Sequence, residues 1–102
     1  MLVAQFDLYR NSRENASVFP YLLDVTHEIN SISKLRVVIP LCNDSHTIAH
    51  LNPIFDIDGE KLYISTMDIA GIPATMLGNA IDNLEDKRTE IVDALDFLVN
   101  GF

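Results

Sequence analysis

The sequence predicts an α+β fold that is mostly β, in which short antiparallel strands are closed by one C-terminal helix. Three observations predict it. Segments of strand-forming residues follow one another too closely for the crossover helices of a parallel sheet. A two-residue turn signal joins two of these segments, and only the last segment has helical periodicity. A doubly wound parallel sheet is therefore excluded.

The first half of the chain supplies three expected strands. Residues 5–9 alternate polar and apolar side chains, as a half-buried strand does. Residues 21–25 and 35–39 are rich in strand-forming residues, and residues 29–34 form the connection between them. We expect the third strand to end at Pro40.

Polar loops and one tight hairpin turn connect the predicted strands. Residues 10–17 and 43–47 are polar and lack periodicity, which is typical of surface loops. The clearest hairpin signal is Asp58-Gly59, which lies between residues 54–57 and 60–64. A two-residue turn needs positive φ, which this dipeptide tolerates, so we expect the two flanking strands to pair.

The last segment is expected to be an amphipathic helix over residues 85–98, with Asn83 as its start signal. Apolar residues recur on one face at helical spacing, namely Leu84, Ile91, Leu95, Leu98 and Phe102. Four more widen that face on its two sides, namely Val92, Val99, Ala94 and Phe97. A single core needs an arc of only about 100°, so the surplus predicts a second packing surface. The alternative is an ordinary solvated face on a terminal core helix.

Length and composition bound the class of protein. A chain of 102 residues predicts a single domain, residues 1–102, and one that association would help to stabilise. Fifteen acidic residues against seven basic ones give a net charge of −8, which disfavours direct binding to nucleic acid. The first residues lack the features of a signal peptide, and no apolar run is long enough to span a bilayer. We expect a cytoplasmic protein that has no membrane partner.

The residues that carry chemistry predict binding rather than catalysis. His46 and His50 are four residues apart, but their neighbours do not favour the helix that a shared metal would need, so no metal site is expected. Cys42 is the only cysteine and is interpreted as a structural residue at a strand end rather than a nucleophile. The sequence has no glycine-rich phosphate loop and no nucleophile elbow.

Read in order, the chain resembles the CcdB family of toxins from bacterial toxin–antitoxin pairs. The resemblance runs nearly from end to end and is carried by an ordered set of segments, namely Gln5-Phe6, Leu23-Asp24-Val25, residues 36–41, Thr66-Met67-Asp68, Ile72-Pro73 and Gly101-Phe102. The family is not enzymatic and uses no cofactor. The resemblance implies a five-stranded antiparallel sheet of the SH3-like barrel type, a smaller sheet, a C-terminal helix and a two-fold homodimer.

The resemblance also implies two partners. Family members bind the A subunit of DNA gyrase and trap the enzyme with cleaved DNA, and an antitoxin with a disordered C-terminal segment neutralises them. By position, the residues implied to bind gyrase are Ile29, Asn30, Asp96, Val99, Asn100, Gly101 and Phe102. The residues implied to bind antitoxin are Arg10, Arg13, Glu14, Cys42, Asn43, Asp44 and His46. The two arginines are expected to pair with acids of the incoming segment.

Two departures keep alternatives open. Asn100 stands where the best-known member has tryptophan, and Asn30 stands where it has an apolar residue. Because aromatic anchors often dominate interface energies, potency is expected to be lower here. One alternative is a non-toxic chromosomal relative that keeps antitoxin binding. The other is a ribonuclease that cuts mRNA on the same barrel, against which the acidic balance counts.

Overall fold

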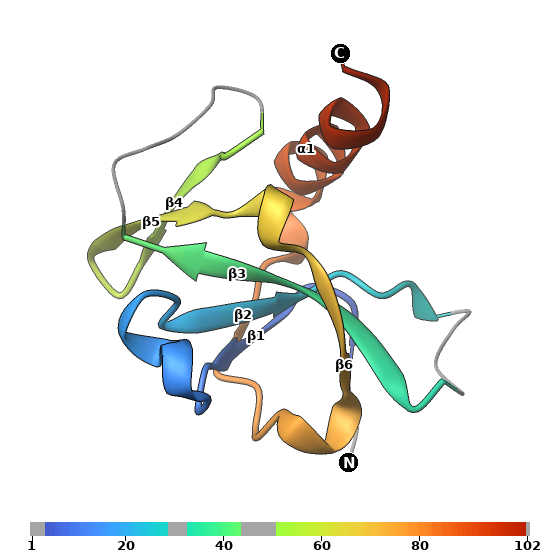
Figure 1. Cartoon of the computed structure of the whole chain (residues 1–102). Coiled ribbons are helices and arrows are strands. Elements are labelled where there is room, and N and C mark those ends of the chain that lie inside the picture. The colour runs from blue at the N-terminus through green and yellow to red at the C-terminus, as the bar shows by residue number, and fades with distance from the viewer. Residues whose placement is uncertain (1–3, 29–32, 44–50, 102) are drawn as a thin grey trace.

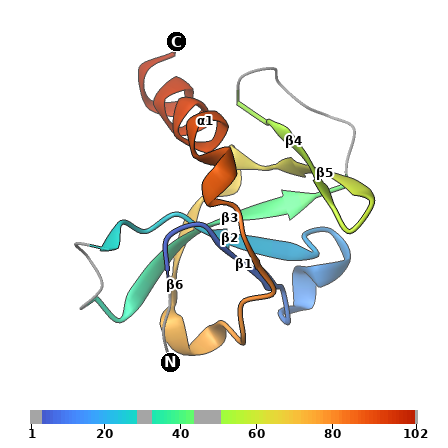
Figure 2. The same ribbon diagram turned by 180° about the vertical axis from the view of Figure 1, so that it is seen from behind.

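A computed structural model describes residues 4–28, 33–43 and 51–101, which form a strongly bent antiparallel sheet with one helix across it (Figures 1 and 2). The strands are β1 (Asp7–Arg10), β2 (Tyr21–Asp24), β3 (Leu35–Cys42), β4 (Ile54–Ile57), β5 (Glu60–Ile64), β6 (Ala70–Pro73) and β7 (Asp82–Asn83). Short 3₁₀ turns are η1 (Glu14–Ser17), η3 (Thr66–Asp68), η4 (Ala74–Met76) and η5 (Glu85–Lys87), and the helix is α1 (Arg88–Asn100). The predicted α+β, mostly β class is confirmed.

Strand β3 organises the sheet because it changes partner along its length. The strand order is β4-β5-β3-β2-β1-β7, and β6 also pairs with β3. On one side β3 pairs with β6 as far as Val38↔Ala70 and with β5 from Leu41↔Ile64, while β2 follows its other side. The smaller sheet implied by the resemblance is therefore joined to the larger one through β3.

The prediction that the third strand ends at Pro40 is wrong, since β3 continues to Cys42. The carbonyl of Pro40 accepts the Ser65 N–H at 2.8 Å, on the side where β3 changes from β6 to β5. The nitrogen and carbonyl of one strand residue point to the same side. The nitrogen of Pro40, which has no hydrogen to donate, therefore faces the gap between β6 and β5. No strand there needs a backbone N–H from this position.

The first strand begins two residues later than predicted, because Phe6 has a left-handed backbone with φ 70°. Its N–H donates to Asp24 O at 2.6 Å and its carbonyl accepts from Leu84 N–H at 2.8 Å, so the buried turn is tied to two distant segments. The predicted hairpin is confirmed: Asp58 and Gly59 have φ of 51° and 81°, and Ile57 pairs with Glu60.

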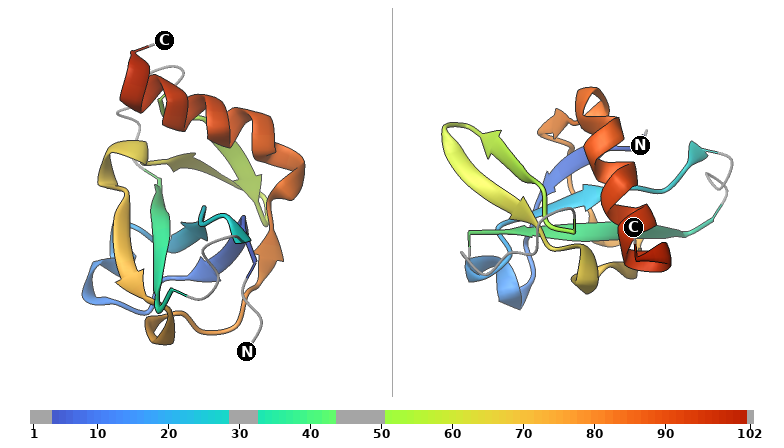
Figure 3. Two further views of the ribbon diagram at one scale, coloured as in Figure 1. Left: turned by 90° about the vertical axis from the view of Figure 1, so that its right-hand side faces the viewer. Right: turned by 90° about the horizontal axis from the view of Figure 1, so that it is seen from above.

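The C-terminal helix is preceded by η5, which starts at the predicted residue. Asn83 Oδ1 accepts the N–H of Glu85, the first residue of η5, at 2.9 Å, although the N-cap position of η5 is occupied by Leu84. The helix α1 runs to Asn100, two residues beyond the predicted end. Ile91 and Ala94 are its buried residues, and it lies across one face of the bent sheet (Figure 3). No helix among the described residues is long and apolar enough to cross a membrane.

Two hydrophobic clusters lie in the fold. The larger one lies between the sheet and α1 and includes Leu23, Ile39, Leu62 and Ile91. The smaller one contains Tyr9, Leu22, Val38, Ile72 and Leu77. Alternate residues of β2 and β3 face the two clusters, because successive side chains of a strand point to opposite faces. A strand that serves two cores in this way is apolar on both faces.

A buried ion pair links β2 and β3 beside the smaller cluster. Arg36 Nε donates to Asp24 Oδ2 at 2.7 Å, and the two side chains are 1% and 0% exposed. The other carboxylate oxygen accepts the Thr26 N–H at 2.9 Å, and the Thr26 hydroxyl accepts the Val37 N–H at 2.7 Å. The pair thereby holds the start of the connection that leads from β2 to β3.

We expect Arg36→Met to lower the free energy of unfolding by about 3–5 kcal/mol, because the Asp24 carboxylate is left buried without its partner. The double variant Asp24→Asn/Arg36→Met should recover much of this loss, since the amide keeps an oxygen for the Thr26 N–H and carries no charge. Urea denaturation of the three proteins measures both effects. An Arg36→Met variant as stable as the parent would contradict the stabilising role of the ion pair.

Candidate functional site

The terminal-helix surface consists of Asp96, Val99, Asn100 and Gly101 at the end of α1, and all four residues are exposed. The first three share one helix face because they are three and four positions apart. Val99 is 79% exposed, the most of any large apolar residue described. The other residues that the resemblance groups with them, Ile29, Asn30 and Phe102, lie outside the described residues.

Gly101 ends α1 in a left-handed conformation, with φ 76°, and its N–H donates to Phe97 O at 2.9 Å. A Cβ at this position would meet no atom within 4 Å, so the glycine is required by its backbone angle and not by crowding within the chain. The last turn of α1 carries no basic residue, and Asp96 lies near the negative end of the helix dipole. The surface combines an exposed apolar side chain with local negative charge.

Further apolar side chains are exposed outside this surface. Met67, on η3, is 67% exposed, and η3 lies beneath the C-terminal half of α1 (Figure 3). Leu35 and Val37 are exposed on β3, opposite Pro73 and Gly71 of β6. On α1 itself the predicted wide apolar arc divides: Ala94 is buried, whereas Val92 and Val99 face solvent.

The second candidate surface lies at one end of the sheet. Arg10 pairs with Tyr21, and Tyr21 pairs with Leu41, so the end of β1 and the end of β3 are separated only by β2. The topology therefore brings Arg10 and Cys42 to the same end of the sheet, although 32 positions separate them in the sequence. Arg10 lies over the Tyr21 ring, 5.8 Å from its centre, and Cys42 is half-buried. Asn43 is exposed, while Asp44 and His46 lie outside the described residues.

The predicted loop after β1 is held in one shape by Asn11, a buried residue that sequence reasoning missed. Its amide nitrogen donates to Asn15 Oδ1 and to Phe19 O, both at 2.8 Å. Its side-chain oxygen accepts the Arg13 N–H at 3.0 Å. Asparagine often closes turns through such bonds, and this is the sequence signal that was overlooked at Asn11. The loop therefore contains the ordered turn η1.

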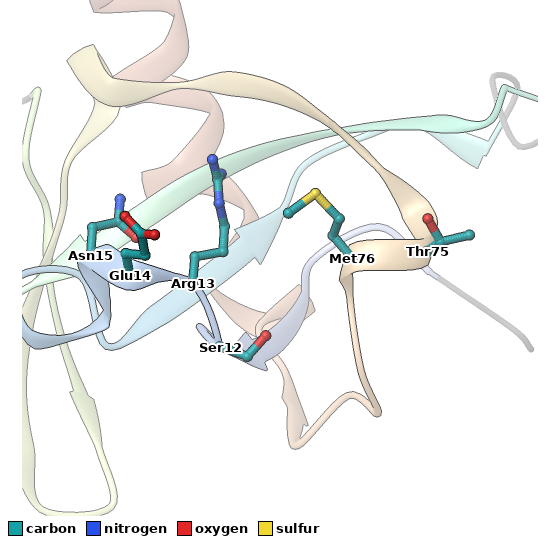
Figure 4. A pocket seen from close by; sticks show the side chains of 6 residues that line it. All are labelled: Ser12, Arg13, Glu14, Asn15, Thr75 and Met76. Atoms are coloured by element: carbon teal, nitrogen blue, oxygen red, sulfur yellow. The ribbon is translucent and has the colours of Figure 1, made fainter.

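A groove of about 710 Å³ lies between η1 and η4, with Ser12, Arg13, Glu14 and Asn15 on one wall and Thr75 and Met76 on the other (Figure 4). Arg13 and Glu14 were predicted to be binding residues. Thr75 and Met76 were not, because no sequence signal connects residues so far apart in the chain.

A family model described as CcdB protein matches residues 5–101. The match spans nearly the whole chain. This chain belongs to the CcdB family. As a CcdB-family protein it is a toxin of the toxin–antitoxin type.

The structure of this CcdB-family chain also bears on metal binding. Within residues 4–28, 33–43 and 51–101, no three His, Cys, Asp or Glu side chains are grouped as metal ligands. The pair His46 and His50, which the sequence analysis considered, lies outside these residues.

Tyr9 on β1, the residue before Arg10, has a perturbed titration. Burial, and then the negative charge of Asp7, raise the pKa of Tyr9 to about 12. The Tyr9 hydroxyl also donates to Asp7 Oδ2 at 3.4 Å, which favours the protonated form. Tyr9 lies in the same hydrophobic cluster as Leu77, the residue after η4.

We expect a stabilising contribution from Tyr9 that is present in full below pH 10 and is lost as the pH rises through about 12. As the pH rises, the Tyr9 hydroxyl ionises first in the unfolded chain, because only the folded state raises its pKa. Thermal unfolding across this pH range should show the decrease in stability, and Tyr9→Phe should remove the part of that decrease that Tyr9 causes. Identical pH profiles for the parent and Tyr9→Phe would contradict the expectation.

Proposed function

We propose that this CcdB-family toxin acts as a homodimer that binds the A subunit of DNA gyrase, traps gyrase with cleaved DNA, and is neutralised by an antitoxin. The observation that carries the proposal is the exposed end of α1 in a chain that matches the family model over residues 5–101. No catalytic step by the toxin itself is involved.

The terminal-helix surface has properties that suit recognition of a large protein partner. Val99 exposes an apolar side chain with no core to fill, and exposed apolar groups of this kind gain most when a partner covers them. Gly101 leaves open space around the backbone where the chain turns away from α1, and Phe102 follows it in the sequence. Asp96 and Asn100 add polar groups at the rim of the same face.

The exposed apolar residues support the homodimer. In one chain, Leu35, Val37, Met67 and Val92 remain exposed on β3, η3 and α1. These elements adjoin the face of the sheet that α1 covers only in part (Figure 3). A two-fold dimer would bury the same patch on both subunits and bring the two helix ends into one recognition surface. The surplus apolar arc of α1 would then have a packing partner.

Charge supports an antitoxin at the sheet end that carries Arg10 and Arg13. The chain is acidic overall, so exposed arginines without acidic partners stand out as recognition groups. Among the described residues, neither arginine forms an ion pair, and both are exposed. Carboxylates of an incoming disordered segment would form charge-assisted hydrogen bonds with them.

We expect the purified toxin to inhibit supercoiling and to trap cleaved DNA with gyrase, and Val99→Asp to weaken this inhibition at least about tenfold, because a charge replaces an apolar contact. The matched control is Ile54→Asp on β4, an exposed isoleucine that does not belong to the terminal-helix surface. Variants are compared at equal folded fraction by circular dichroism.

Three results would redirect the proposal. Absence of trapped breaks with the parent protein would remove the gyrase assignment. Cleavage of RNA by the pure protein would establish the ribonuclease alternative. Harmless expression without antitoxin, in cells whose gyrase is sensitive to a known family member, would favour the non-toxic relative.

We expect light scattering to give a mass of about twice 11.4 kDa for the parent, and Met67→Asp to shift the protein toward the monomer, because a charge enters the apolar patch. Ile54→Asp again serves as the control and should remain dimeric. A monomeric parent at the concentrations used in the gyrase assay would contradict the dimer.

A further inference from the structure

We infer that the groove between η1 and η4 is a preformed docking site for one stretch of the antitoxin that combines a carboxylate with an apolar side chain, with Arg13 binding the carboxylate and Met76 contacting the apolar group. The inference rests on the proposed antitoxin partnership. It extends the binding surface to η4, an element to which neither the motifs nor the resemblance pointed.

Both walls of the groove are held in place before any ligand binds. On the η1 wall, three hydrogen bonds of the Asn11 side chain fix the turn. On the η4 wall, the N–H of Ala74, the first residue of the turn, donates to Lys34 O at 2.8 Å, and Leu77 is buried after the turn. A site built in this way loses little conformational freedom on binding, which favours affinity.

The charge of Arg13 is available to a ligand. Arg36 forms the buried ion pair with Asp24, and Arg88 Nη1 lies 3.4 Å from Glu85 Oε1. Arg13 is exposed and forms no ion pair with any described residue. Glu14 lines the same wall and would repel a run of acids, as would the net charge of −8. A single carboxylate flanked by an apolar residue suits this wall better than an acidic run.

The opposite wall offers an apolar contact. Met76 is 44% exposed, and its side chain extends across the groove toward the Arg13 side (Figure 4). Its thioether is flexible and adapts to partners of different shape. The apolar part of a ligand would therefore rest on Met76 while its carboxylate reaches Arg13.

The openness of the groove indicates a peptide chain as occupant. All six lining residues are exposed, from Ser12 on one wall to Met76 on the other, so no part of a ligand would be enclosed. Small-molecule sites usually bury most of their ligand. The groove also adjoins Arg10 and the end of β1, and so continues the surface proposed for the antitoxin.

The test measures binding of the purified cognate antitoxin to full-length toxin by calorimetry. Arg13→Glu and Met76→Asp are each expected to weaken binding about ten- to hundredfold. Met76→Leu should bind within about threefold of the parent, because it keeps the apolar contact. The matched control Lys61→Glu makes the same charge change on β5, away from both walls, and should also retain binding.

Gyrase inhibition by the same variants without antitoxin separates the possible failures. The inference predicts parental inhibition, since neither residue belongs to the terminal-helix surface. Parental antitoxin affinity for both Arg13→Glu and Met76→Asp would overturn the groove and leave the proposed function standing. Equal weakening by Lys61→Glu would reduce the effect to net charge and also overturn it. Absence of antitoxin binding by the parent would remove the proposed partnership and the groove together.

Discussion

The change of partner along β3 is the constraint on which the rest of the structure depends. Because β3 pairs with β6 up to Val38 and with β5 from Leu41, two sets of strands diverge from one strand and the sheet bends. The bend creates two apolar clusters on opposite faces, one covered by α1 and the other bordered by the turn after β6. The buried pair between Arg36 and Asp24 secures the strand beside this divergence. Both candidate surfaces follow from this arrangement, since one lies at the end of α1 and the other beside η4.

The two surfaces differ in their physical character as well as their place. The end of α1 and the turn η1 lie toward opposite ends of the molecule in both orientations of the ribbon (Figures 1 and 2). The first is apolar and acidic and projects from the fold, whereas the second is a groove that presents an unpaired arginine. A partner matched to one surface is therefore poorly matched to the other. This separation supports a toxin that recognises its target and its antitoxin by different chemistry on one small scaffold.

Local sequence signals were reliable where a local rule governs the structure. Asp58-Gly59 formed its turn because positive φ is a property of the residues themselves. Asn83 marked the start of the C-terminal helical segment because its side chain accepts a hydrogen bond from a backbone N–H only two residues further along the chain. Pro40 led to a wrong strand end, because proline interrupts a strand only where a neighbouring strand needs the N–H that proline lacks. The ion pair of Arg36 with Asp24 carried no local sign of its role, since its two members lie on different strands that only folding brings together.

The sequence by itself determined the antiparallel, mostly β class, the tight hairpin, the terminal amphipathic helix and the family, because each depends on the spacing or order of residues along the chain. The tertiary structure alone decided which apolar residues of α1 face solvent, and it alone brought η4 to Arg13. Exposure is set by what the rest of the chain covers, and a groove is set by how far apart two walls lie. Neither quantity is encoded in a local pattern, so Met76 acquired a proposed role only when the fold placed it beside η1.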